Sequence, residues 1–283
     1  MNAELTTLIR NHPLLMRRTR FVSQAQPGER VLRVFCRPQH CLVVSEPFTP
    51  DAVAQSVGTN GDKEFLFAIF PAGPGTQVER CQDAQGWLIG SHDNHDGVLE
   101  VAVREDRMLW KAGRAAFLGP PERADEALAP LIEFAFVEGQ IRRLEAEVDA
   151  AWTACHGHIS LTHQVMSKDV ARWPAVNEMT RRVTLCRMDC CDLRRQLESP
   201  SAELSAAARQ VYGDLCAGAR LADRLAAMEA RINAMMSLYS AANDRLSAYS
   251  YFRREWWLEV WIILVIIAEL AVIFLQLWLA GWK

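Results

Sequence analysis

A long apolar run near the C-terminus constrains this chain more than any other feature. From Leu258 to Leu279 nearly every residue is apolar. At about 1.5 Å per residue, a helix of this length spans the ~30 Å hydrocarbon core of a bilayer. The favourable transfer of its Leu, Ile, Val and Phe side chains outweighs the roughly 3 kcal/mol cost of one central carboxylate, Glu269. We therefore expect residues 256–280 to form a single transmembrane helix.

The residues on both sides of the run are those that flank membrane spans. Tryptophan rings prefer the headgroup region, and cytoplasmic flanks are rich in Arg and Lys. Because Arg253 and Arg254 precede the run and only Lys283 follows it, we expect an inner or plasma membrane, with the N-terminal bulk in the cytoplasm or an organellar matrix. The expected interface anchors are Trp256, Trp257, Trp261, Trp278, Trp282, Arg253 and Arg254.

Composition limits the classes to which the rest of the chain can belong. The formal net charge is −3, without the basic excess of a nucleic-acid binder, so no nucleic-acid partner is expected. Eight scattered cysteines fit a reducing compartment better than a disulfide framework. The basic segment 1–29 lacks the apolar core of a signal peptide, and an organellar presequence is its alternative interpretation.

Residues 30–120 have the pattern of a compact α+β head domain. Short β-rich runs alternate with turn segments such as PAGPG and SHDNHDG. The segment TPDAVAQSV, capped by Thr49 or Asp51, is the expected internal helix, and Pro120-Pro121 closes the domain. The expected strands are VLRVFC, CLVV, EFLFAIF, GWLIGS, GVLEVAV and RMLWKA.

Beyond the head, apolar residues recur at alternating intervals of three and four, the period of helices that pack lengthwise. Residues 122–199 hold two such helices, separated at Trp173-Pro174, and are expected to form a coiled-coil hairpin. The first apolar seam is Phe134, Val137, Ile141, Leu144, Val148, Ala151 and Cys155, and the second is Val176, Met179, Val183, Cys186, Cys190, Leu193 and Leu197.

A third helix is expected to form a stalk at 200–255. Ser199 as N-cap and Pro200 at the first position open it. No Gly or Pro separates its seam from the apolar run, so one rod from Ser201 to about Ala280 is expected. The seam is Leu221, Leu225, Met228, Ile232, Met235, Tyr239, Ala242, Leu246 and Tyr249.

Two features of this rod predict a homo-oligomer. Tyr239, Leu246 and Tyr249 lie beyond the shorter hairpin helices, so they would be exposed unless another subunit covered them. Glu269 and Gln276 share one helix face inside the membrane run, where a chain with a single span has no second helix to pair with them.

The polar positions of the run allow two interpretations. Glu269 and Gln276, with Glu259 nearer the start of the run, either clamp the oligomer together or line a cation pathway. The polar clamp is the simpler interpretation, because a single polar face needs no more than a neighbouring copy to satisfy it.

Two histidine clusters are candidate metal sites. His92 and His95 lie in HDNHD, which ends in an Asp-Gly turn signal, so a solvated turn is the alternative. His156, His158 and His163 follow the first coil helix, at spacings that match no common zinc pattern.

Catalytic motifs are absent from the sequence. PAGPGT lacks the Lys-Ser or Lys-Thr of a phosphate-binding loop, and GxSxG, HExxH and GxGxxG do not occur. We expect neither enzymatic activity nor a cofactor.

The C-terminal half carries residues that support a family resemblance: Arg182-Val183, Leu258-Glu259, Ile262-Ile263-Leu264 and Glu269. With them the chain resembles the RMD-type family, named for "required for meiotic nuclear division" and also called sporulation or YagE-type proteins. The resemblance implies a membrane-anchored, self-associating protein, and mitochondrial members support organellar translation. Cys186 follows Leu185 where the family usually has Asn.

The expected architecture is also similar to that of CorA-type magnesium and zinc transporters, which join an α/β head to a long stalk helix. Their second span and Gly-Met-Asn signature are absent. Three functional hypotheses follow. The first is a tail-anchored homo-oligomeric scaffold or tether, with a further protein partner at the head. The alternative is a CorA-like cation channel with a pore lined by Glu269 and Gln276. The third is a metal-sensing head that uses His92 and His95.

Overall fold

The computed structural model describes residues 15–27, 29–36, 40–48, 63–71, 77–89, 97–111, 113–163 and 165–280. The chain divides into two compact units. Unit 1 comprises Met1–Glu147 and Cys186–Ala230, and unit 2 comprises Val148–Leu185 and Arg231–Lys283. The expected helix TPDAVAQSV lies outside the described residues.

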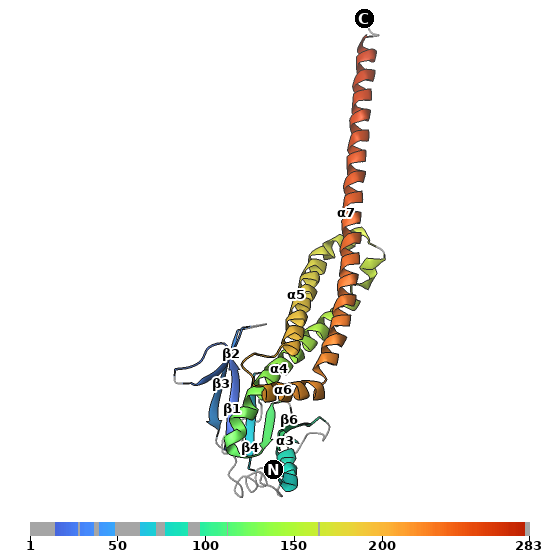
Figure 1. The fold of residues 1–283 in the computed structure, drawn as a ribbon. Helices are drawn as coiled ribbons and strands as arrows, with labels where there is room; N and C mark the ends of the chain where they lie inside the picture. The colour runs from blue at the N-terminus through green and yellow to red at the C-terminus, as the bar shows by residue number, and fades with distance from the viewer. Residues whose placement is uncertain are drawn as a thin grey trace, which may run out of the picture. The chain divides into compact units, whose positions relative to one another are not determined.

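Within the described residues, unit 1 is built on a seven-stranded mixed sheet in the order β2-β3-β1-β4-β7-β6-β5 (Figure 1). All neighbouring strands are antiparallel except β4 and β7, which run parallel. The expectation of a head that contains a β-sheet and precedes long helices is thus confirmed. The strands are β1 (Leu15–Val22), β2 (Val31–Phe35), β3 (Cys41–Phe48), β4 (Glu64–Phe70), β5 (Leu99–Val103), β6 (Asp106–Lys111) and β7 (Arg114–Leu118).

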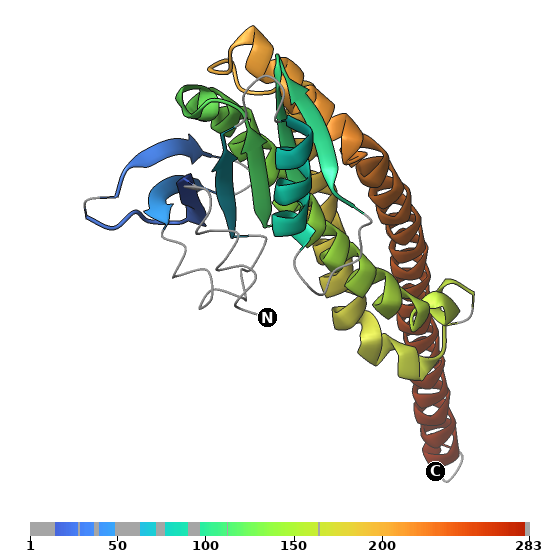
Figure 2. The same ribbon diagram turned by 90° about the horizontal axis from the view of Figure 1, so that it is seen from below.

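Helix α3 (Gln77–Ile89) covers one face of the sheet (Figure 2). Its Ala84 and Leu88 belong to the same buried cluster as Phe70 and Leu118. Strand β4 is apolar at every position after Glu64 because both of its faces are buried, which is the pattern of a central strand.

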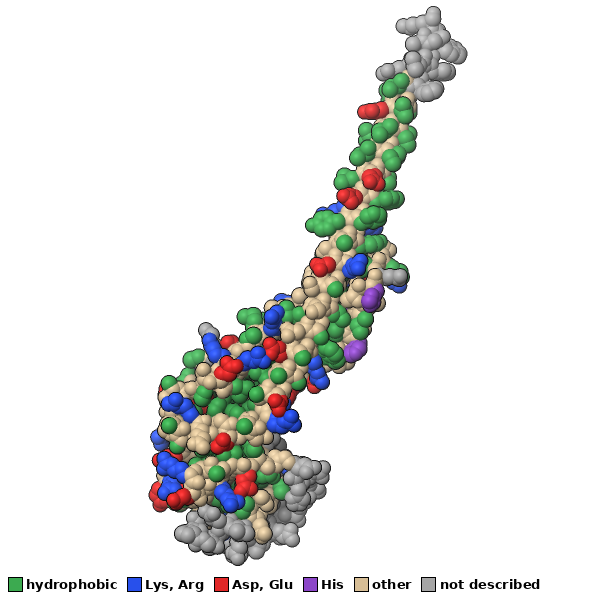
Figure 3. All heavy atoms as spheres, turned by 45° about the vertical axis from the view of Figure 1, so that its right-hand side comes forward, with side chains coloured by type: hydrophobic (Ala, Val, Ile, Leu, Met, Phe, Trp, Pro, Cys, Tyr) green, Lys and Arg blue, Asp and Glu red, His purple; other side chains and the backbone are tan. Residues whose placement is uncertain are grey.

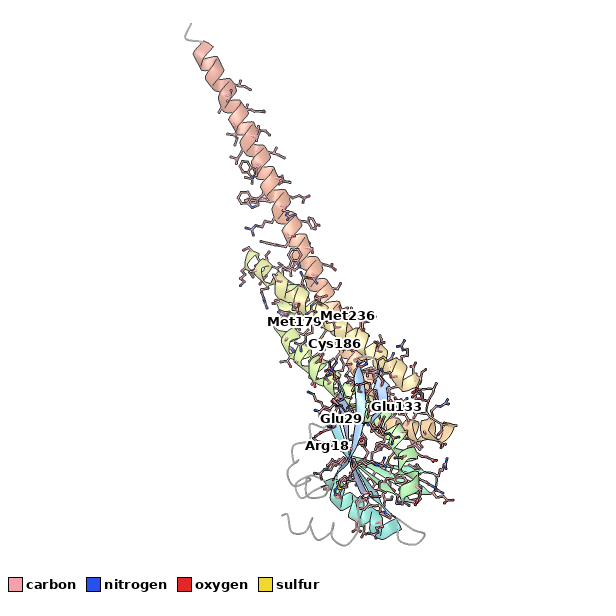
Figure 4. All side chains as sticks on the ribbon, turned by 90° about the vertical axis from the view of Figure 1, so that its left-hand side faces the viewer. Arg18, Glu29, Glu133, Met179, Cys186 and Met236 are labelled. Atoms are coloured by element: carbon pink, nitrogen blue, oxygen red, sulfur yellow. The ribbon has the colours of Figure 1, made fainter. Side chains whose placement is uncertain are left out.

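Helix α4 (Ala124–His156) packs on the opposite face of the sheet. The ring of Phe134 meets that of Trp110 edge-on, with centroids 5.4 Å apart, and Phe136 stacks on Phe35 at 3.9 Å. Glu133, labelled in Figure 4, is buried and forms an ion pair with Arg33 of β2. Aromatic packing and a buried charge pair together fix the start of α4 against the sheet.

Three parts of the head differ from the sequence expectation. Strand β1 lies in the segment expected to be a basic N-terminal extension, and it pairs with both β3 and β4. Strand β7 was not expected. Residues 86–89 of the run GWLIGS, expected as a strand, form the end of α3, and from this helix Trp87 and Leu88 pack against the sheet.

The long helices are α4, α5 (Trp173–Glu198), α6 (Ala206–Gly218) and α7 (Leu221–Ala280). The connections from α4 to α5 hold two short 3-10 helices, η2 (Ile159–Thr162) and η3 (Ser167–Arg172). Most of the seam side chains predicted for α4 and α5 are buried. Their pairing as a coiled-coil hairpin stays a prediction.

The expected single rod from Ser201 is wrong, because two helices occupy this region. The side-chain oxygen of Ser205 accepts a hydrogen bond from the backbone N–H of Ala208 and caps α6 (3.1 Å). Arg220 adopts a left-handed φ of 52°, which ends the helical path before α7 begins. A Cβ on Gly218 would lie 2.2 Å from Leu99 Cδ1, so the end of α6 closely approaches β5.

The predicted seam of α7 is buried, but it is buried within one chain. Tyr239 and Leu246 are both 0% exposed, so the prediction that a second subunit must cover them is wrong. Tyr249 is partly buried. The buried seam positions are Leu221, Leu225, Met228, Ile232, Met235, Tyr239, Ala242 and Leu246.

In unit 1, a charged pair sets the position of α7 along α4. The guanidinium of Arg224 donates to both carboxylate oxygens of Glu145, at 2.8 and 2.6 Å. The hydrogen bonds to Glu145 raise the pKa of Arg224. A bidentate pair of this kind fixes geometry more tightly than a single contact does.

We expect Met228→Ala to lower the free energy of unfolding by about 2–5 kcal/mol, since it leaves a cavity in the seam. Circular dichroism melts of the detergent-solubilised chain at two protein concentrations would measure the loss. Because the seam is intramolecular, the loss should be the same at both concentrations. Met188 on α5 is 61% exposed, so Met188→Ala is the matched control and should change little. A loss that disappears at high protein concentration would mean an intermolecular seam.

Candidate membrane-anchoring site

The C-terminal part of α7 exposes apolar side chains on all sides. From Tyr251 to Ile273 every side chain is exposed except that of Val260, which is partly buried. Figure 3 shows hydrophobic side chains along the visible face of this segment. Among the described residues, one helix is long and apolar enough to cross a membrane, and it is α7. This finding suggests single-pass anchoring at the C-terminal end.

Two parts of the same helix differ sharply in the exposure of their apolar side chains. Leu246 is fully buried, whereas Ile262 is 58% and Leu270 is 56% exposed. Soluble monomers rarely leave so extended an apolar surface in water. Each Å² moved from water into an apolar phase is favourable by about 25 cal/mol, so a bilayer stabilises this segment.

The acidic residues of the segment lie at different depths and on different faces. Glu259 and Glu269 are both exposed in the single chain. They are ten positions apart, so on an ideal helix they are separated by about 15 Å along the axis and about 80° around it. If Leu258 marks the start of the hydrocarbon core, Glu259 lies at its edge and Glu269 near its middle.

Gln276 belongs to α7, but its side chain lies outside the described residues. Seven positions separate it from Glu269, which places both positions within about 20° on one face. Glu259 therefore does not belong to the face that positions 269 and 276 share.

Aromatic and basic side chains gather at the start of the segment. The rings of Trp256 and Trp257 meet edge-on with centroids 5.4 Å apart. Arg253, Arg254 and Trp261 are exposed beside them. The side chain of Trp278 and the whole of Trp282 lie outside the described residues. The near side of the segment thus has the composition of a membrane interface.

The structure adds a groove that sequence reasoning missed. Val170 of η3 and one face of α7 line an open groove of about 530 Å³. No local sequence signal links η3 to α7, because roughly eighty residues separate them, and only the fold brings them together. The lining residues from α7 are Ser250, Arg253, Arg254, Trp257, Leu258 and Trp261.

The candidate metal-binding histidines do not converge. His156 Nδ1 lies 3.1 Å from the carbonyl oxygen of Trp152, and His158 Nδ1 lies 3.2 Å from the hydroxyl of Tyr239. His163 is exposed. No three His, Cys, Asp or Glu side chains in the described ranges are placed to hold a metal ion. His92 and His95 lie outside those ranges.

His158 instead belongs to a partly buried polar cluster in unit 2. Burial raises the pKa of Tyr239 to about 12 and also raises that of the Cys155 thiol. Burial, with the positive charge of Arg172, lowers the pKa of His158. All three groups therefore favour their neutral forms near neutral pH.

A lowered histidine pKa makes stability depend on pH in one direction. The unfolded chain binds a proton at His158 near its ordinary pKa of about 6.5, while the folded chain resists it. We expect the urea midpoint of unfolding to fall as pH drops through that value. His158→Gln should make this fall shallower, whereas the exposed His156→Gln should leave it unchanged. An identical slope in all three proteins would contradict the assignment.

Comparison of the sequence with protein-family models and with curated proteins finds no match.

Proposed function

We propose that the chain is a tail-anchored, homo-oligomeric membrane scaffold or tether that holds its α+β head at a membrane surface. The observation that carries the proposal is the exposed, largely apolar segment of α7 from Tyr251 to Ile273. Arg253 and Arg254 near the start of this segment favour a head on the cytoplasmic or matrix side of an inner or plasma membrane.

Self-association rests on Glu269 alone, since the seam of α7 is buried within one chain. A carboxyl group near the bilayer centre costs roughly 2.5–3.5 kcal/mol when it faces lipid. Hydrogen bonds between copies offset part of that cost, as polar side chains commonly do between membrane helices. A polar clamp between neighbouring copies is therefore the role proposed for Glu269.

Ending the chain after Glu255 should release it from membranes, because this change removes the apolar segment and leaves the buried seam intact. Alkaline carbonate extraction measures the result: the full chain should stay in the pellet, and the shortened chain should move to the supernatant. Ile263→Leu, which keeps the segment apolar, is the control and should stay in the pellet. A shortened chain that resists extraction would place the membrane contact elsewhere.

Glu269→Leu should weaken self-association in detergent by about 3- to 30-fold, the range expected for one interhelical hydrogen bond of 0.6–2 kcal/mol. Sedimentation equilibrium of the solubilised chain measures this change. Glu269→Gln keeps hydrogen-bonding capacity and should associate nearly as well as the native chain. Ile267→Leu, about 160° around the helix, should have no effect.

The same variants separate the scaffold from a channel. Cation flux into liposomes that is present in the native chain and abolished by Glu269→Gln would overturn the scaffold proposal. It would favour a pore lined by Glu269 instead.

A further inference from the structure

The groove between η3 and α7 has a charged end and an apolar end. On α7 its lining residues fall at intervals of three and four, from Ser250 to Trp261, so they share one helix face. Arg253 and Arg254 stand at one end, and Trp257 and Trp261 continue toward the other. The groove is therefore amphipathic along the axis of the helix.

Both arginines of the groove are unpaired. Across the residues that the structure describes, neither Arg253 nor Arg254 forms an ion pair with a carboxylate. Two arginines earlier in the same helix are paired: Arg224 with Glu145 and Arg231 with Asp149. Two guanidinium groups side by side without a counter-charge constitute a site suited to an anion.

Acidic side chains nearby do not neutralise this end. Glu255 and Glu259 lie two positions before and after Trp257, so on an ideal helix each projects about 160° away from it. On η3, Asp169 is buried and accepts a hydrogen bond from the backbone N–H of Met166 at 2.9 Å. Lys168 gives η3 a further positive charge, while Arg172 lies 3.9 Å from the carboxylate of Asp169 and pairs with it.

The positions along α7 match the layers of a bilayer. Arg254 precedes Leu258 by four residues, or about 6 Å, and the headgroup layer on each side is roughly 5–8 Å thick. Trp261 lies about 4–5 Å on the other side of Leu258. In a bilayer whose hydrocarbon core starts at Leu258, Arg253 and Arg254 would therefore lie at the level of the lipid phosphates, Trp257 at the core boundary and Trp261 among the upper acyl chains.

We propose that this groove binds one acidic phospholipid of the membrane that α7 enters, with Arg253 and Arg254 holding its phosphate. The lipid's glycerol and upper acyl chains contact Trp257, Leu258 and Trp261. A free phosphate ion would satisfy the arginines but would leave the apolar end of the groove unfilled. The proposal rests on the membrane anchor of the proposed function and not on self-association.

Native mass spectrometry of the full chain tests the site. Protein in mild detergent is mixed with equal amounts of phosphatidylglycerol and phosphatidylcholine, and retained lipid is counted. The native chain should retain phosphatidylglycerol preferentially. Arg253→Gln and Arg254→Gln should each reduce that preference about five-fold. Arg245→Gln removes the same charge from an exposed position of α7 about 120° around the helix from Trp257, and it should leave the preference unchanged.

Three results would overturn the site. The first is an equal preference for phosphatidylglycerol in the native chain and in the groove variants. The second is a loss of that preference in Arg245→Gln as large as in the groove variants. The third is complete displacement of the lipid by inorganic phosphate at millimolar concentration. Carbonate extraction from phosphatidylcholine liposomes separates the two proposals. A chain that fails to insert there defeats the anchor, whereas a chain that inserts without lipid preference defeats only the groove site.

Discussion

Along α7, apolar side chains meet two different surroundings. Up to Leu246 they are buried on one side by the chain's own helices, and from Tyr251 onward they are exposed on every side. Transfer of apolar surface out of water drives both halves, but only the first half finds its partner within the chain. The second half needs a solvent other than water. The roles proposed for the membrane anchor, for Arg253 and Arg254 and for Glu269 all depend on that requirement.

The helical and membrane features were largely predictable because each depends on a regular local pattern. The three- and four-residue intervals of the α7 seam identified its buried face, and the length of the apolar run identified the exposed segment. What the pattern left open was the identity of the partner. The seam pattern predicts that Tyr239 is covered by another element. Only the structure shows that this element belongs to the same chain. The expectation that a second copy must cover the seam was therefore wrong, whereas the oligomer inferred from Glu269 stays a prediction.

The head was harder to predict, for reasons visible in individual residues. Strand β1 carries Arg17, Arg18 and Arg20, whose charge suggested a basic extension. The strand nevertheless lies between β3 and β4, and its Met16 and Thr19 side chains are buried. Strand β7 contains two alanines, which have a weak β propensity. Whether such residues form a strand depends on the strands packed beside them. The end of α3 has an apolar run too short to separate helix from strand by period. The groove between η3 and α7 was beyond reach, since it joins segments far apart in sequence.

Because α7 is one continuous helix, the direction in which Glu269 points around the helix axis is fixed relative to the buried seam. Within unit 2, Tyr239, Ala242 and Leu246 project about 120–180° around the axis from Glu269, and Trp257 about 120°. In the proposed assembly, with Glu269 directed at a common centre, the α4 and α5 segments of unit 2 would lie on the periphery. The arginine groove would likewise face away from that centre, toward lipid.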